Sequence, residues 1–232
     1  MNSDTAAALD VYDFKSVRQH NAAYTDRTAE IHNLLTRSTE GGNHCLLLRQ
    51  LSARGSSTAL FLSTIKYLYL GEEELFRGLY IHNRWDWTQP RREVVHLDLS
   101  EGRYAYPQQT IASLCRHIVH AAAACVPPVT LTSPTPPLLL DELFTALKRR
   151  GGQTPVLLVE GYDTPVTCVP SSTGARTHFN TPALEATFSL LEDAERHLTL
   201  FTGVQRLPIQ GLDTLEVIAE DMESAVRMAM GL

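Results

Sequence analysis

The stretch that decides the fold is Pro155-Val156-Leu157-Leu158-Val159-Glu160-Gly161-Tyr162-Asp163. Its first part is an unbroken apolar run with β-branched residues at both ends, which predicts a strand buried on both faces. Helical patterns separate this run from three other short apolar runs, at 44–48, 94–99 and 198–202. Strands that alternate with helices predict an α/β fold, with one parallel sheet covered by helices on both faces.

Helical periodicity and capping residues predict the elements between these strands. The expected helices cover 28–37, 59–70, 108–124, 138–150 and 183–196, and a last short helix covers 221–230.

The remaining segments predict a tail and two loop insertions in a single domain. Residues 1–10 are small and polar, so we expect a flexible N-terminal tail before a domain over 11–232. Five prolines fall within 126–137, and proline disfavours regular pairing, so this segment is expected to be poorly ordered or to form an exposed excursion. Residues 164–182 are rich in Pro, Ser, Thr and Gly and predict a second long loop.

Composition excludes several classes of protein. The chain has 232 residues, and 20 Lys and Arg against 26 Asp and Glu give a net charge of −6, which argues against a general nucleic-acid coat. A hydrophobic fraction of 44% argues against disorder. The sequence has no apolar run of the roughly 20 residues that a membrane span needs, and its start lacks a secretory pattern. Four widely spaced cysteines predict free thiols and an intracellular setting, in the nucleus or the cytoplasm.

The loop after the first strand is the first candidate site, because ligands bind at the carboxyl ends of the strands in open α/β sheets. Gly55-Ser56-Ser57-Thr58 leads there from a strand into a helix, which is the setting of a phosphate-binding loop. Such a loop needs a lysine, and none lies between Arg49 and Ile65. The pattern alone therefore favours a polar turn that caps a helix.

The tip of the 155–159 strand is the second candidate site. Glu160 and Asp163 follow the apolar run. In nucleotide-binding proteins, a carboxylate at the end of an apolar strand holds the magnesium ion beside the nucleotide. The alternative is that both carboxylates simply end a strand in solvent, and the pattern alone favours it.

Three other groups carry weaker signals. Cysteines and histidines at 115, 117, 120 and 125 suggest zinc, but an alanine-rich helix favours packing and surface histidines. Trp85-Asp86-Trp87 could form an aromatic platform, although packing is favoured. Lys148-Arg149-Arg150 is interpreted as a helix C-terminal cap.

Several blocks, in order over about residues 11–220, resemble one known family. They are Asp13-Phe14-Lys15-Ser16-Val17-Arg18, Tyr24-Thr25-Asp26-Arg27-Thr28, Leu60-Phe61-Leu62-Ser63-Thr64-Ile65, Glu74-Leu75-Phe76-Arg77-Gly78-Leu79-Tyr80-Ile81, His96-Leu97-Asp98-Leu99-Ser100, Leu157 to Pro165, and Leu200-Phe201-Thr202-Gly203-Val204. Together they are similar to the AAA-ATPase-like family, P-loop proteins that are often fused to a PD-(D/E)XK nuclease-like domain. The resemblance implies a P-loop NTPase-like sheet.

The chain departs from the family pattern where catalysis would take place. The family's Gly-Lys-Ser becomes Gly55-Ser56-Ser57, or Ser57-Thr58-Ala59 in the ungapped register, and both lack the lysine. The position of the family's metal aspartate holds Glu160, and that of its catalytic glutamate holds Gly161. The resemblance therefore implies a vestigial nucleotide site without a bound cofactor, formed by Arg49, Arg54, Gly55, Ser56, Ser57, Thr58, Glu160, Asp163 and Thr202.

These departures favour a catalytically inactive ATPase fold that binds protein partners as a scaffold. The long polar loops and frequent Ala, Thr and Arg suggest a chromosome-associated or other nuclear assembly. The alternative is a weakly active ATPase with ATP and magnesium, in which Glu160 holds the metal and Arg49 or Arg54 replaces the lysine. A nuclease is a third class: no nuclease-like block follows Val204 in this sequence, and in a longer parent protein such a block would lie downstream.

Overall fold

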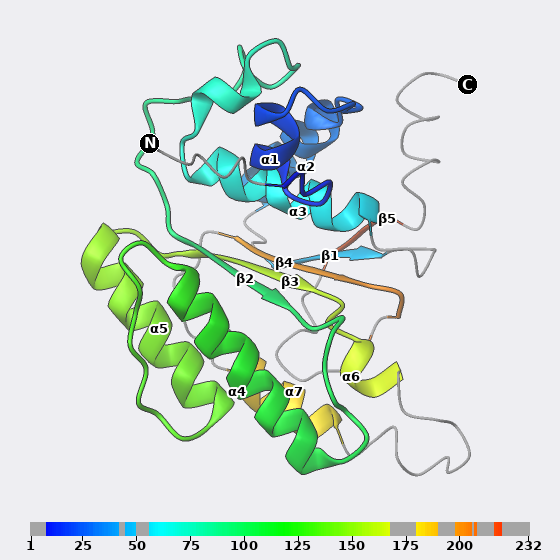
Figure 1. The fold of residues 1–232 in the computed structure, drawn as a ribbon, viewed down its shortest axis with the longest axis vertical. Helices are drawn as coiled ribbons and strands as arrows, with labels where there is room; N and C mark the ends of the chain where they lie inside the picture. Colours follow the sequence, from blue (N-terminus) through cyan, green and yellow to red (C-terminus); the bar gives the residue numbers. More distant parts are fainter. Residues whose placement is uncertain are drawn as a thin grey trace, which may run out of the picture.

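A five-stranded parallel sheet is the centre of the molecule. The computed structural model describes residues 8–41, 45–49, 56–167, 180–189, 198–205, 207 and 216–219. The strand order is β2-β3-β4-β1-β5 (Figure 1). The strands are β1 (Cys45–Arg49), β2 (Val94–Asp98), β3 (Val156–Glu160), β4 (Thr199–Gly203) and β5 (Glu216–Ala219). The first four confirm the four predicted strands, which are parallel and lie in one sheet.

Helices cover both faces of the sheet, as predicted (Figure 1). On one face lie α1 (Phe14–Gln19), α2 (Thr28–Gly41), α3 (Ser56–Tyr69) and the 3-10 helix η1 (Glu73–Phe76). On the other face lie α4 (Pro107–Ala124), α5 (Pro136–Gly151) and α7 (Thr181–Ser189), and the short α6 (Thr164–Thr167) follows β3. The predicted helices α2 to α5 and α7 are confirmed, whereas α1, η1 and β5 are too short to carry a clear periodic signal.

Successive side chains of a strand point to opposite faces of the sheet, so the core consists of two clusters, one on each face. Leu157 and Val159 of β3 and Phe201 of β4 pack with α4, α5 and α7. Val156 and Leu158 of β3, with Leu200, pack with the α1–α3 layer. All five side chains of β3 are buried, as expected of a strand that is covered on both faces.

Two aspartates in the family-like blocks attach the N-terminal layer to the rest of the fold. Asp13 accepts a hydrogen bond from Ser16 N at 2.7 Å, which caps α1, and another from the Tyr67 hydroxyl at 2.8 Å, which ties α1 to α3. Asp26 accepts from the Thr28 hydroxyl at 2.6 Å and from Tyr80 N at 2.8 Å.

The Pro-rich segment is an exposed excursion, as predicted, but it is shorter than 126–137. Pro136 and Pro137 begin α5, because the first turn of a helix needs no proline N–H. Val126 is 86% exposed. Glu142 of α5 accepts hydrogen bonds from Thr132 N at 3.1 Å and Ser133 N at 2.9 Å, which hold the excursion against α5.

The second predicted loop is also shorter than expected. Its first residues, Thr164–Thr167, form α6, and α7 already begins at Thr181. The centre of that loop, the end of the 183–196 helix, the 221–230 helix and residues 1–7 of the tail lie outside the described residues. Among the described helices, none is long and apolar enough to cross a membrane.

Candidate functional site

The candidate site lies where the parallel strands end, and α3 begins near the same edge of the sheet. Glu160 ends β3, and Thr202 lies near the end of β4. By backbone position, Arg49 ends β1 and Ser56 and Ser57 begin α3, while Arg54 and Gly55 lie outside the described residues. Thr58, in the first turn of α3, is 7% exposed.

Glu160 is buried beside a histidine. Its Oε2 atom lies 3.6 Å from Nε2 of His96, which stands opposite Leu158 in the parallel register. Both side chains lie on the face of the sheet that the α1–α3 layer covers, because they alternate in step with Val94 of β2 and Leu158 of β3. The sequence prediction singled out Glu160 but not His96, although His96 lies in a family-like block.

Gly161 has a backbone conformation that side chains rarely adopt. Its φ is +61°, and a Cβ atom there would lie 3.0 Å from Ser100 N and 2.8 Å from the Thr164 hydroxyl. Glycine lacks that atom, so β3 can turn close against the loop that follows β2. The family's glutamate at this position would require the backbone to move.

Asp163 is buried and accepts hydrogen bonds from within the fold. It is 3% exposed, and its Oδ2 atom accepts hydrogen bonds from Val204 N at 3.0 Å and Gln205 N at 2.8 Å. Burial raises the pKa of this carboxyl, and the two backbone donors oppose the rise. Gly203 permits the contact, because a Cβ there would lie 2.5 Å from Asp163 Oδ1.

Thr202 is the predicted site residue whose hydroxyl lacks a hydrogen-bond partner among the described residues. It is 1% exposed and continues the Leu198–Leu200 positions of β4, which face the α1–α3 layer. Glu160 and Thr202 therefore lie on the same face of the sheet, near its carboxyl edge.

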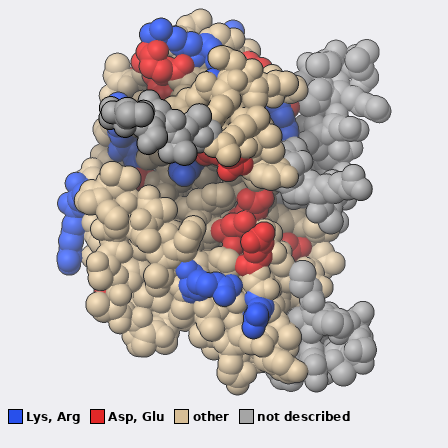
Figure 2. Space-filling view, viewed as in Figure 1, with Lys and Arg blue, Asp and Glu red and all other residues tan. Residues whose placement is uncertain are grey.

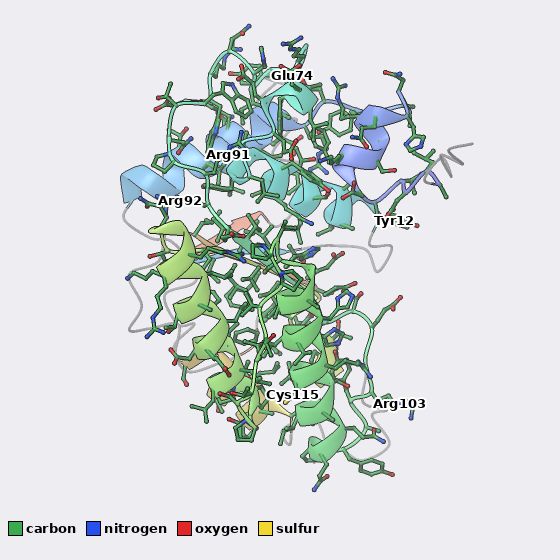
Figure 3. All side chains as sticks on the ribbon, turned by 60° about the vertical axis from the view of Figure 1, so that its left-hand side comes forward. Tyr12, Glu74, Arg91, Arg92, Arg103 and Cys115 are labelled. Carbon is green, nitrogen blue, oxygen red and sulfur yellow. The ribbon has the colours of Figure 1, made fainter. Side chains whose placement is uncertain are left out.

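The described residues do not bring together a metal-binding set. Within them, no group of three or more His, Cys, Asp or Glu side chains is placed to hold an ion. Cys125 is buried and free, and Cys115 is partly buried, on the part of α4 near α5 in Figure 3. Cys125 belongs to the core cluster beside α5 and Cys115 packs against that cluster, as the packing interpretation predicts. Cys45 and Cys168 are not described at the side-chain level.

The tryptophans and the basic helix end also have structural partners. Trp85 packs edge-on against Tyr69, and Trp87 packs against Phe76, so the predicted packing role is confirmed. Lys148, Arg149 and Arg150 lie in the last turn of α5, as expected, and the guanidinium of Arg150 also pairs with Glu93 at 2.7 Å, which links α5 to the segment before β2. The C-terminal cap of α5 is Gly152, whose N–H bonds to Lys148 O.

Comparison with known proteins identifies the family. Residues 8–213 match the family described as "Predicted AAA-ATPase". The chain is also 26% identical over 204 residues to the "Uncharacterized protein in vnfD 5'region" of Azotobacter chroococcum mcd 1. This match covers 85% of the chain but only 37% of the relative's length. No solved structure matched. Since the family match extends over most of the chain, this protein belongs to the AAA-ATPase-like family.

Proposed function

We propose that this chain is a catalytically inactive ATPase-fold domain that acts as a protein-interaction scaffold. The observation that carries the proposal is the geometry at Gly161, where the resemblance expects the catalytic glutamate. A positive φ and a backbone nitrogen 3.0 Å from the Cβ position oppose any side chain there. The turn after β3 has therefore adapted to glycine, beyond the exchange of one side chain.

The phosphate end of the site supports the same proposal. No lysine lies between Arg49 and Ile65, so the charge that contacts the β- and γ-phosphates is missing. Lysine loss acts on phosphate binding and glutamate loss acts on activation of water, so the two losses affect different steps. Together they account for a domain without turnover.

The intact parts of the fold support the scaffold role. Asp13 and Asp26 keep the hydrogen bonds that attach the N-terminal layer to α3 and to the Tyr80 segment. The excursion after α4 adds exposed surface that Glu142 holds in place. A fold that retains its packing while its catalytic positions diverge suits a role in binding. The nuclear or chromosome-associated setting stays a prediction.

One observation favours the alternative of a weak Mg-dependent ATPase. The Thr202 hydroxyl is buried without a partner among the described residues, and Glu160 lies on the same face. Under this alternative Glu160 would hold the metal, so Glu160→Ala would abolish nucleotide binding.

Calorimetry with Mg-ATP separates the two functions. The proposal expects a dissociation constant weaker than about 1 mM, corresponding to roughly 4 kcal/mol of binding free energy, and the same result for Glu160→Ala. Micromolar binding that Glu160→Ala removes would support the ATPase instead. For the scaffold role, affinity purification of the tagged chain from its own cells should recover defined protein partners.

A further inference from the structure

The outer edge of β2 is the feature that the proposed function leaves unused. β2 stands at the end of the strand order, on the near side of the sheet in Figure 1. Leu99 N bonds to Glu160 O at 2.8 Å and Val156 N bonds to Glu93 O at 2.9 Å, so the odd-numbered residues pair with β3. Because successive residues of a strand alternate, Val94, His96 and Asp98 direct their backbone N–H and C=O groups away from the sheet.

Backbone N–H groups at the two ends of this edge have hydrogen-bond acceptors, whereas the outward backbone groups in its middle have no partner among the described residues. Arg92 N donates to Tyr69 O at 2.9 Å, and Ser100 N donates to Asp98 Oδ1 at 2.9 Å. Between them, no hydrogen bond from the described residues reaches the outward backbone groups of Val94, His96 or Asp98. The strand contains neither a proline nor a bulge, the usual devices that prevent an edge from pairing.

The carboxyl end of this edge carries unpaired negative charge. Asp98 and Glu101 are exposed, and neither forms an ion pair with a described Lys or Arg. Figure 2 shows acidic side chains gathered at mid-height on this face. At the other end, Figure 3 shows Arg91 and Arg92 on the segment that leads into β2. A strand lying along β2 would therefore gain from a cation near Asp98.

We propose that the free edge of β2 accepts an extended segment of a partner protein as an added strand, with a Lys or Arg of that segment over Asp98 and Glu101. This inference rests on the proposed scaffold function and names its partner surface. In strand addition, main-chain hydrogen bonds supply affinity and the alternating side chains supply specificity. The outward groups of Val94, His96 and Asp98 provide those bonds.

The test uses a display library of random twelve-residue peptides, selected on the full chain, with the enriched peptides then synthesised. His96→Pro removes the outward N–H of the middle residue and leaves the bonds between β2 and β3 intact. His96→Ala is the matched control, because it removes the same side chain but keeps the N–H. We expect binding to weaken at least about fivefold in His96→Pro relative to His96→Ala, the effect of one net hydrogen bond.

Two further measurements keep the test decisive if His96→Pro fails to fold. Amide hydrogen exchange at Val94, His96 and Asp98 should slow in the peptide complex. Glu101 is exposed, and Glu101→Lys should weaken the binding of peptides that carry Lys or Arg. The inference is overturned if no peptide is enriched, if those amides are not protected, or if the chain instead forms a dimer through this edge. Mg-ATP turnover would refute the inactive-ATPase proposal alone, whereas failed peptide binding would refute the β2 inference alone.

Discussion

The N-terminal layer and the carboxyl edge of the sheet keep family-like residues to very different degrees. In the layer, Asp13, Arg18 and Asp26 still make hydrogen bonds to distant segments, including one of 2.7 Å from Arg18 Nε to Leu75 O. At the sheet edge the expected lysine and glutamate are gone, and Asp163 binds the backbone of Val204 and Gln205. We infer that the motif residues of the N-terminal layer maintain the fold, whereas the proposed loss of catalysis concerns only the residues at the carboxyl ends of the strands.

The largest expected effect tests whether the turn after β3, at the carboxyl edge of the sheet, has adapted to glycine. Gly161→Ala should lower the free energy of unfolding by about 3 kcal/mol, from a strained φ and a contact with Ser100 N. Gly152→Ala is the matched control, because Gly152 has a φ of +67° with no atom within 4 Å of its Cβ position, and should cost about 1 kcal/mol. Urea unfolding measures both. Equal losses of unfolding free energy in the two variants would show that the turn after β3 could still accept a side chain.

The next effect tests the layer that has kept its motifs. Asp26→Ala should cost about 2 kcal/mol, because the buried Thr28 hydroxyl and Tyr80 N lose their acceptor. Asp86 is exposed like Asp26 and makes the same local turn with Thr88, but its carboxylate accepts no long-range hydrogen bond from the described residues, so Asp86→Ala should cost clearly less. Thermal unfolding of the two variants compares them. An Asp26→Ala loss as small as that of Asp86→Ala would remove the structural role assigned to the block.

A smaller effect concerns pH near the carboxyl end of β2. Burial, followed by the charge of Arg116, lowers the pKa of His117, which lies 3.4 Å from the Tyr104 hydroxyl. The unfolded chain, with a histidine pKa of about 6.5, then binds more protons than the folded chain, so the free energy of unfolding falls as pH drops below about 6.5.

Replacing His117 should therefore flatten that pH dependence. Urea unfolding between pH 7.5 and 5, values chosen to bracket about 6.5, should show a smaller loss for His117→Gln than for the wild type. The exposed His120→Gln serves as the control and should keep the wild-type slope. An unchanged slope in His117→Gln would contradict the burial argument.

Much of the fold could be predicted because its strands carry strong local signals. The runs around Val156–Glu160 and Thr199–Gly203 are apolar and bounded by turn residues, so their positions shifted by only one residue. Glu216–Ala219 was missed because four residues with two strong apolar side chains do not stand out from a loop. Pro136 and Pro137 were assigned to a loop because a proline that begins a helix looks like one that breaks it.

The candidate site was harder to predict because it depends on contacts across the sheet. Glu160 and Thr202 could be chosen from strand ends, but the His96 contact follows from the register between β2 and β3. The positive φ of Gly161 and the use of Asp163 by Val204 and Gln205 arise from long-range packing. Single-residue patterns carry no information about such packing.

Phosphate release from Mg-ATP by the wild-type chain tests the central claim most directly. The sequence has no lysine between Arg49 and Ile65 and has Gly161 where the resemblance expects the catalytic glutamate, so we predict no turnover above the uncatalysed background. Glu160→Ala, which removes the carboxylate that the ATPase alternative assigns to magnesium, should give the same trace. Turnover above roughly one per minute in the wild type, against a usual enzyme scale of about 1 per second and faster, with loss of that turnover in Glu160→Ala, would contradict the account.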